Sequence, residues 1–273
     1  MTAASPSGAG RSGGPRIDPL LADRVTEAVL LAGLPVAYGG HGPGVHLRPA
    51  RPLDDADDCA GLLAVHWEPG PRLAAAAAAG LPGQPVASAR LIVTGGMTNA
   101  LAEFLPDFGI TVVPGRDGGE TRVGGFTGPL PAGGRGVPAP PPAGSAPLEL
   151  GIGTDVVDAV RRSAALAGLP VADHLYAPGI TLGPCRPADD GDDTTGVADL
   201  GWNPPRRMSA VADGGTPAAE QAARLRAAVR DAMRHAIGSV LGACGLEARW
   251  RRPAGLPAQL RAYGPAQRPP VGR

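Results

Sequence analysis

Residues Leu31–Pro69 read LAGLPVAYGGHGPGVHLRPARPLDDADDCAGLLAVHWEP, and the chain repeats them as Leu166–Pro204, LAGLPVADHLYAPGITLGPCRPADDGDDTTGVADLGWNP. The two stretches align without a gap at a shift of 135, and 20 of their 39 positions are identical. An internal repeat of this length indicates one structural module used twice. We therefore predict that both stretches fold alike and that the flanking segments complete two copies of one module.

The segments in front of the repeat predict one helix in each copy. Asp18 and Pro19 are a capping acid followed by proline at the first helical position, and Thr154 is the expected cap in copy 2. Apolar residues then recur at helical spacing, namely Leu21, Val25, Ala28, Val29 and Ala32 in copy 1 and Val156, Val160, Ala164 and Ala167 in copy 2. Both helices should end at the Gly-Leu-Pro that comes next, because glycine suits the left-handed position after a helix and proline prevents its continuation.

Two alternating runs within the repeat, 44–49 and 61–67 in copy 1, flank an acidic turn and predict a β-hairpin. Since strand side chains alternate between faces, the apolar set must be the core face: Val45, Leu47, Leu63, Val65 and Trp67, matched by Ile180, Leu182, Ala198, Leu200 and Trp202. Trp67 and Trp202 are then the largest core side chains of the two copies. The opposite face also carries apolar Leu62 and Ala64, so we expect the other module to cover it.

A helix and a strand close each module, at a shift of 136. Copy 2 predicts one long helix over 217–243, whereas Gly95 and Gly96 should break the helix of copy 1. Strands are expected at 110–113 and 246–250. The predicted fold is α+β: a tandem duplication of a helix–hairpin–helix–strand module of about 95 residues, arranged like a pseudo-twofold dimer.

Composition predicts where order should end. Residues 1–16 are too polar and small to form a core, and 114–150 is rich in Gly and Pro like a linker. We therefore predict a disordered tail at 1–16, modules at 17–113 and 151–252, a linker at 114–150 and a loose Pro-rich tail at 253–273.

Composition also limits the chemistry. All 25 basic residues are Arg, so the chain lacks the lysine of a phosphate-binding loop and of a Schiff base. The abundant Ala, Gly and Pro indicate a high-GC bacterial genome. Three cysteines without metal-ligand spacing, no apolar signal sequence and no apolar run of about 20 residues favour a cytoplasmic protein that does not cross a membrane.

A histidine pair in copy 1 is the first candidate site. With the hairpin centred on Ala56, His46 and His66 oppose each other on the non-core face, and Glu68 lies two residues further along that face. Two imidazoles and a carboxylate could bind one divalent metal. Copy 2 has Thr181, Gly201 and Asn203 at the corresponding positions. The alternative is two ordinary histidines on a partly covered sheet face.

The acidic turns are the second candidate, with four carboxylates in five residues of each copy: Asp54, Asp55, Asp57, Asp58, and Asp189, Asp190, Asp192, Asp193. Such oxygen clusters can bind Ca²⁺, but neither turn has the pattern of an EF-hand loop. Solvated acidic turns that discourage edge pairing explain them equally well.

Arginines near the end of copy 2 are the third candidate, in a region with 12 Arg and four acids, 12 − 4 = +8. Arg226, Arg230 and Arg234 follow one helix face, with Arg249 and Arg251 nearby. This face could bind the phosphates of a polyanion, or could simply be a solvated face or dock on the acidic turns.

No nucleophile motif or acid–base set is evident, and no cofactor is implied beyond a divalent metal at the histidine pair. We therefore expect a non-enzymatic binding module that acts on a protein or small molecule through its inter-module cleft or sheet surface. The alternatives are a nucleic-acid or polyanion binder using the arginine stripe, and a metal-dependent enzyme using the histidine pair.

Overall fold

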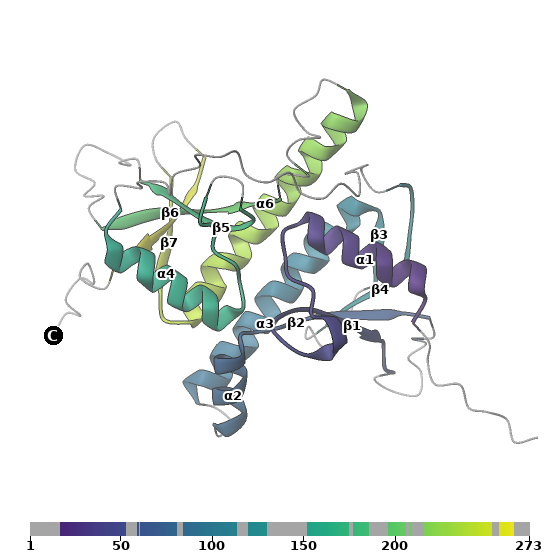
Figure 1. Ribbon diagram of the computed structural model, residues 1–273, viewed down its shortest axis with the longest axis horizontal. Helices are drawn as coiled ribbons and strands as arrows, with labels where there is room; N and C mark the ends of the chain where they lie inside the picture. Colours follow the sequence, from purple (N-terminus) through teal and green to yellow (C-terminus); the bar gives the residue numbers. More distant parts are fainter. Residues whose placement is uncertain are drawn as a thin grey trace, which may run out of the picture.

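Helices and antiparallel strands alternate along the chain in the computed structural model (Figure 1). The structure describes residues 17–52, 59, 61–80, 84–113, 120–129, 152–174, 177–185, 196–205, 208, 216–252 and 257–264. The helices pack against two four-stranded antiparallel sheets, so the predicted α+β class is confirmed. The predicted tail 1–16 and both acidic turns lie outside the described residues.

The N-terminal half forms the sheet β1-β2-β4-β3. Its elements are α1 (Pro19–Leu31), the 3₁₀ turns η1 (Tyr38–Gly40) and η2 (Leu105–Phe108), α2 (Pro71–Ala79), α3 (Pro85–Phe104), β1 (Gly44–Pro49), β2 (Leu63–Glu68), β3 (Ile110–Val113) and β4 (Thr121–Phe126).

The C-terminal half forms its own sheet in the corresponding order, β5-β6-β8-β7. Its elements are α4 (Thr154–Ala167), β5 (Gly179–Pro184), β6 (Val197–Asn203), α6 (Pro217–Ala243), β7 (Glu247–Arg251) and β8 (Gln259–Tyr263).

Local signals account for both first helices. The Asp18 carboxylate accepts a hydrogen bond of 2.9 Å from the backbone N–H of Leu20, as expected of a cap. In the second copy Gly153 is the cap and Thr154 is the first helical residue, so the predicted threonine cap is wrong. Gly33 and Gly168 follow the two helices with φ of 83° and 79°, a conformation that favours glycine.

The hairpin register agrees with the prediction. His46 pairs with His66 and Val45 with Trp67, while Thr181 pairs with Gly201 in the second sheet. Trp67 and Trp202 are 0% and 1% exposed, so both lie in the core as expected.

Two strands lie where we predicted a linker and a loose tail. β4 occupies part of 114–150 and β8 part of 253–273, and each pairs with the second strand of a hairpin. In each hairpin, one edge of the second strand has backbone N–H and C=O groups that the first strand does not pair. Hydrogen bonds to β4 in one sheet and to β8 in the other satisfy these groups. Neither strand was predicted, because TRVGGF contains two glycines and QLRAY lies in a Pro-rich segment.

α3 runs without interruption through Gly95 and Gly96, so the predicted break is wrong. The helix packs along α6 at the centre of the molecule, the most extensive contact between helices (Figure 1). A Cβ placed on Gly96 would lie 3.3 Å from Cγ2 of Val240, whereas one on Gly95 would meet nothing within 4 Å. Gly96 therefore lets the two helices approach closely, and this tertiary contact outweighs the low helix propensity of glycine.

These neighbouring glycines make a matched pair for mutation. Gly95→Ala is expected to raise the free energy of unfolding by about 1 kcal/mol, because alanine has the higher helix propensity and the site is open. Gly96→Ala should raise the free energy of unfolding clearly less, since the added methyl group would press on Val240. Urea denaturation measures both, and an equal or larger gain for Gly96→Ala would contradict the proposed role of that residue.

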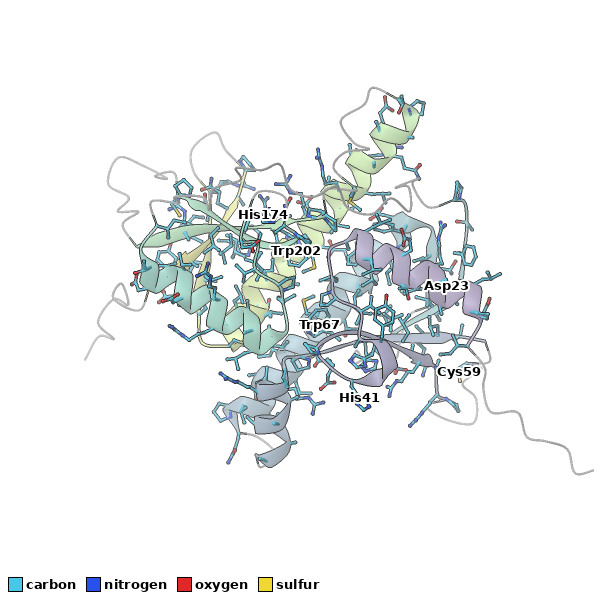
Figure 2. All side chains as sticks on the ribbon, in the orientation of Figure 1. Asp23, His41, Cys59, Trp67, His174 and Trp202 are labelled. Carbon is cyan, nitrogen blue, oxygen red and sulfur yellow. The ribbon has the colours of Figure 1, made fainter. Side chains whose placement is uncertain are left out.

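The two halves share one continuous hydrophobic core. The indole N–H of Trp67 donates to the carbonyl of Ala167 at 2.9 Å, and that of Trp202 donates to the carbonyl of Ala32 at 2.8 Å. Each tryptophan therefore binds the end of the first helix of the opposite half, and Figure 2 shows both near the junction. The two bonds are reciprocal, because Trp67 and Trp202 differ by 135, as do Ala32 and Ala167.

The outer face of the first sheet is not where the halves meet. On that face Arg122 is 4% exposed. Its Nε lies 3.3 Å from Oε1 of Glu120, whose other oxygen binds Arg48 at 2.8 Å. Among the described elements, those in extensive contact with this sheet all belong to the N-terminal half, so the prediction that the other module covers this face is wrong. The hydrogen bond from this sheet to the other half comes from the side that carries Trp67.

Candidate binding groove between the two halves

The Gly-Leu-Pro that ends each first helix lies at the junction of the halves. After Gly33 the N–H of Leu34 donates back to Val29, and after Gly168 the N–H of Leu169 donates back to Ala164. These bonds close the two helices in the same way. They turn the chain so that the prolines that come next reach the surface side by side.

A Cβ on Gly33 would lie 3.1 Å from Cβ of Pro178, and one on Gly168 would lie 2.7 Å from Cβ of Pro43. Both positions therefore require glycine for two reasons: the backbone φ is positive, and the other half approaches too closely for a side chain.

Between the two turns lies an open groove of about 560 Å³. Ten of its eleven lining residues form five pairs related by the shift of 135: Leu30 with Ala165, Gly33 with Gly168, Leu34 with Leu169, Pro35 with Pro170, and Pro43 with Pro178; Pro205 is the eleventh. The groove therefore consists mainly of the same residues contributed once by each half.

The groove walls are almost wholly apolar. Five of the lining residues are prolines, which have no N–H. The N–H groups of both glycines and both leucines already donate to helix carbonyls. Such walls offer few hydrogen-bond donors to orient a polar metabolite, but they can cover an apolar surface.

One feature of the sequence points to this groove, although taken by itself it indicates only the end of a helix. The letters LAGLP are identical in both stretches, and identity that extends to the half-buried proline exceeds what a helix cap requires. Nothing in the sequence placed the two turns against each other.

The structure brings His46 and His66 together but adds no third ligand. The ring centroids lie 5.2 Å apart, and Nε2 of His46 lies 2.8 Å from the carbonyl oxygen of Gly42. Glu68 is bound by Arg90 at 3.2 Å. The described part of the chain contains no group of three His, Cys, Asp or Glu residues that could hold a metal ion. A catalytic zinc site uses three protein ligands, so Glu68 would have to leave Arg90 to complete a site with the two histidines.

His66 has an unusual electrostatic setting. Burial, together with the charges of Arg48 and His46, lowers the pKa of His66 to about 4, although Glu120 opposes this shift. Its Nδ1 is buried and has no hydrogen-bond partner among the described residues. Both observations favour the neutral ring in the folded protein.

Acidification is therefore expected to destabilise the protein through His66. Between its ordinary pKa of 6.5 and its folded value of about 4, the unfolded chain binds a proton that the folded chain does not. The free energy of unfolding should fall as the pH drops through this window. Urea titrations at pH 7, 5.5 and 4.5 should show a smaller fall for His66→Gln than for wild type or the control His46→Gln. An unchanged pH dependence in His66→Gln would contradict the assignment.

Three of the five arginines predicted to form a stripe lie on one helix, and the other two lie on β7. Arg226, Arg230 and Arg234 lie along α6, where burial and the charges of Arg234 and Arg226 lower the pKa of Arg230. Arg249 is engaged instead with Glu247 at 2.5 Å, and its guanidinium lies 5.9 Å from the ring centroid of Tyr263. Arg251 is exposed at the end of β7.

Two buried arginines were not predicted from the sequence. Arg122 pairs with Ala64, and Arg261 pairs with Asp199, which is 135 residues beyond Ala64. Each sheet therefore places an arginine at the same register, and each arginine has Glu or Gln two residues before it. The shared pattern Glu/Gln-x-Arg was the only signal of this equivalence in the sequence.

Comparison with protein-family models, with curated proteins and with solved structures gave no match. Among the described helices, none is both long enough and apolar enough to span a bilayer.

Proposed function

We propose that this protein is a non-enzymatic binding module of the bacterial cytoplasm that holds an aliphatic segment of a partner protein in the groove between its halves. The observation that carries the proposal is the groove of about 560 Å³ lined by apolar residues of both halves. Because the groove is open, it cannot enclose most of a small ligand, as small-molecule sites usually do. A side-chain row projecting from a larger partner suits it better.

The proposal includes an origin by tandem duplication. It is supported by the gap-free repeat, the matching strand orders, the reciprocal tryptophan bonds and the paired groove residues. A pseudo-twofold groove would present the same surface to a partner segment in either direction.

The fluorescent apolar probe 8-anilinonaphthalene-1-sulfonate tests the groove. We expect saturable binding to the folded protein, weakened at least tenfold by Leu30→Glu and by Ala165→Glu, which place a negative charge at exposed positions of the groove and oppose the sulfonate of the probe. Leu20→Glu is the matched control, because Leu20 lies on the same helix as Leu30 and is 68% exposed outside the groove. A model helix with a leucine face should displace the probe. Equal probe binding in wild type and both groove variants would overturn the proposal.

A polyanion-binding function is the second candidate, favoured by the mutual repulsion of the α6 arginines. Like charges held along one helix face destabilise one another, and a bound polyanion would relieve this repulsion. Retention on heparin measures the effect: the triple variant Arg226→Gln, Arg230→Gln, Arg234→Gln should elute at clearly lower salt than wild type. Elution of wild type itself at low salt would reject this function.

A further inference from the structure

A row of arginines on α6 leads to an exposed aromatic ring. Arg226, Arg230 and Arg234 are four residues apart, so they follow one ridge of the helix in steps of about 6 Å along its axis. The next position of this ridge is Gly238, where a Cβ would lie 3.8 Å from Nε1 of Trp250. Trp250 belongs to β7 and is 43% exposed. The indole therefore lies where the row of side chains would continue.

The positive charge of the row is only partly balanced within the protein. Burial, followed by the charges of Arg234 and Arg226, lowers the pKa of Arg230, although Asp231 opposes this shift. Within the part of the chain that the structure describes, neither Arg230 nor Arg234 makes an ion pair. Nε of Arg234 is buried without a hydrogen-bond partner there. An anionic ligand would supply the counter-charge that the chain does not.

The N-terminal half shows that the fold does not require these arginines. α3 corresponds to α6 at the shift of 136, and it carries Thr94 and Thr98 where α6 carries Arg230 and Arg234. Both helices form and pack against each other at the centre of the molecule (Figure 1). The two arginines are therefore an addition of the second half that helix packing does not explain, which favours a role in binding.

Trp250 is held against α6 while part of its side chain stays accessible. Gly238 allows both Trp250 and its strand partner Leu260 to approach the helix closely. The ring of the exposed His235, which follows Arg234 on α6, has its centroid 5.6 Å from that of Trp250. An aromatic surface thus lies directly beside the end of the arginine row.

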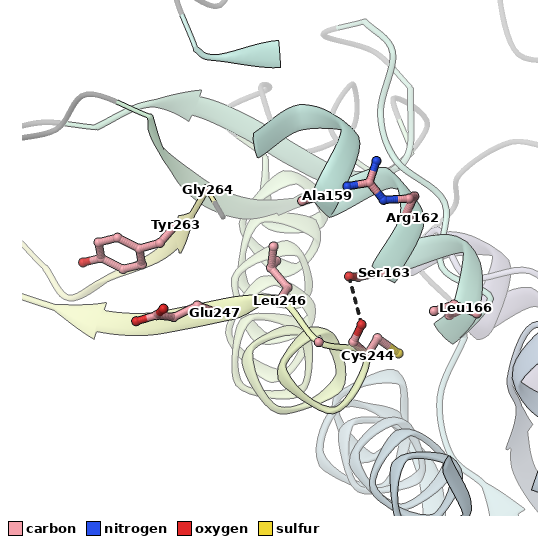
Figure 3. A pocket seen from close by; sticks show the side chains of 10 residues that line it. Ala159, Arg162, Ser163, Leu166, Cys244, Leu246, Glu247, Tyr263 and Gly264 are labelled. Atoms are coloured by element: carbon pink, nitrogen blue, oxygen red, sulfur yellow. Dashed lines mark hydrogen bonds between the residues drawn. The ribbon is translucent and has the colours of Figure 1, made fainter. Parts of the chain in front are cut away.

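The opposite face of β7 does not extend this surface, because its arginine is already engaged. Arg249 is bound by the Glu247 carboxylate, and its guanidinium lies 5.9 Å from the ring centroid of Tyr263. Figure 3 shows Glu247 and Tyr263 on neighbouring strands, at the edge of a hollow of about 260 Å³. The binding surface is therefore limited to the α6 arginines and Trp250.

We propose that this surface binds a single-stranded nucleic acid, with phosphates at Arg230 and Arg234 and one base stacked on Trp250. The inference rests on the polyanion-binding function proposed above and specifies its ligand. Arginines one helical turn apart can each bind a successive phosphate of an extended strand. A base stacks on an aromatic ring whatever its identity, whereas a polyanion without bases cannot. A duplex offers phosphates but keeps its bases paired and stacked inside.

Oligothymidylate, oligouridylate and inorganic polyphosphate are the probes that test the surface. We expect both oligonucleotides to bind saturably and to quench tryptophan fluorescence, because Trp250 is exposed whereas Trp67 and Trp202 are buried. Polyphosphate should bind without quenching. Tighter binding of oligouridylate would identify RNA as the ligand, and tighter binding of oligothymidylate would identify DNA.

Variants separate the base from the phosphates, with affinity measured by the anisotropy of a labelled oligothymidylate. Trp250→Leu should weaken its binding about tenfold and abolish the quenching, but leave the affinity for polyphosphate unchanged. Trp250→Phe keeps an aromatic ring and should restore part of the affinity. The double variant Arg230→Gln, Arg234→Gln should weaken binding of both probes. It should also lower the logarithmic salt dependence of oligothymidylate binding by about 0.7 for each arginine removed.

The matched control is the double variant Arg161→Gln, Arg162→Gln, which removes the same charge from α4 and should affect both probes far less. Unchanged oligothymidylate binding in Trp250→Leu, with polyphosphate still bound through the α6 arginines, would overturn the single-strand proposal and leave the polyanion function standing. Binding of a duplex as tightly as of the single strand would overturn it as well. Absence of binding to every probe would reject both.

Discussion

Trp67→Ala is expected to lower the free energy of unfolding by about 5 kcal/mol, and Trp202→Ala by a similar amount. Both side chains are buried, and removing a buried Trp costs about 3–5 kcal/mol through lost burial and the cavity left behind. The upper end of this range applies because each variant also leaves a helix-end carbonyl, Ala167 or Ala32, without its indole donor. Urea denaturation followed by far-ultraviolet circular dichroism measures the loss.

Trp→Phe variants at the same positions separate the two contributions. Phenylalanine keeps much of the apolar volume but lacks the N–H, so a loss of about 1–3 kcal/mol is expected from the unsatisfied carbonyl alone. Trp250→Ala is the control, because Trp250 is 43% exposed and should matter far less. Unchanged melting of Trp67→Ala or Trp202→Ala would refute the shared core.

Glu120→Ala should lower the free energy of unfolding by about 3 kcal/mol, because it removes the carboxylate that lies 3.3 Å from Nε of the nearly buried Arg122. Arg122→Met should lower the free energy of unfolding by a smaller amount. It removes the buried charge itself, while Glu120 keeps its bond to Arg48.

The test is which of the two variants, Glu120→Ala or Arg122→Met, loses more free energy of unfolding. Denaturation with urea, which leaves ionic strength unchanged, measures both variants. Arg48→Met is the control for the exposed partner, since its side chain is 46% exposed and surface ion pairs contribute about 0–1 kcal/mol. A smaller loss for Glu120→Ala than for Arg122→Met would show that the carboxylate is not needed to stabilise the buried guanidinium.

The elements with strong local signals were predictable. Asp18-Pro19 set the start of α1, Gly33 its end, and the strict alternation around Trp67 set the hairpin register residue by residue. These features depend on interactions within a few positions of the chain, so composition and spacing are enough to identify them.

Elements defined by distant partners escaped prediction. β4 and β8 are strands because β2 and β6 offer them an open edge, and their own glycine or arginine content indicates nothing of the kind. Helix propensity predicts a break at Gly96, yet the close approach of α6 makes glycine suitable there. Both errors have one cause: the deciding contact lies more than fifty residues away along the chain.

The candidate sites divide in the same way. The pairing of His46 with His66 followed from hairpin arithmetic, whereas the engagement of Glu68 by Arg90 depends on a helix packing beside the strand. The groove needed both Gly-Leu-Pro turns to meet, and that contact joins segments far apart in the chain.

The amino-acid order alone specified two similar sets of helices and hairpins, their inward faces and the positions at which the copies differ. Those properties follow from local periodicity and turn chemistry. Packing between segments far apart in the chain specified how the sets meet: Trp67 and Trp202 each bind the opposite half, and two proline turns form one groove. Burial and close contact are properties of surfaces in space, and the order of residues does not display which surfaces face each other.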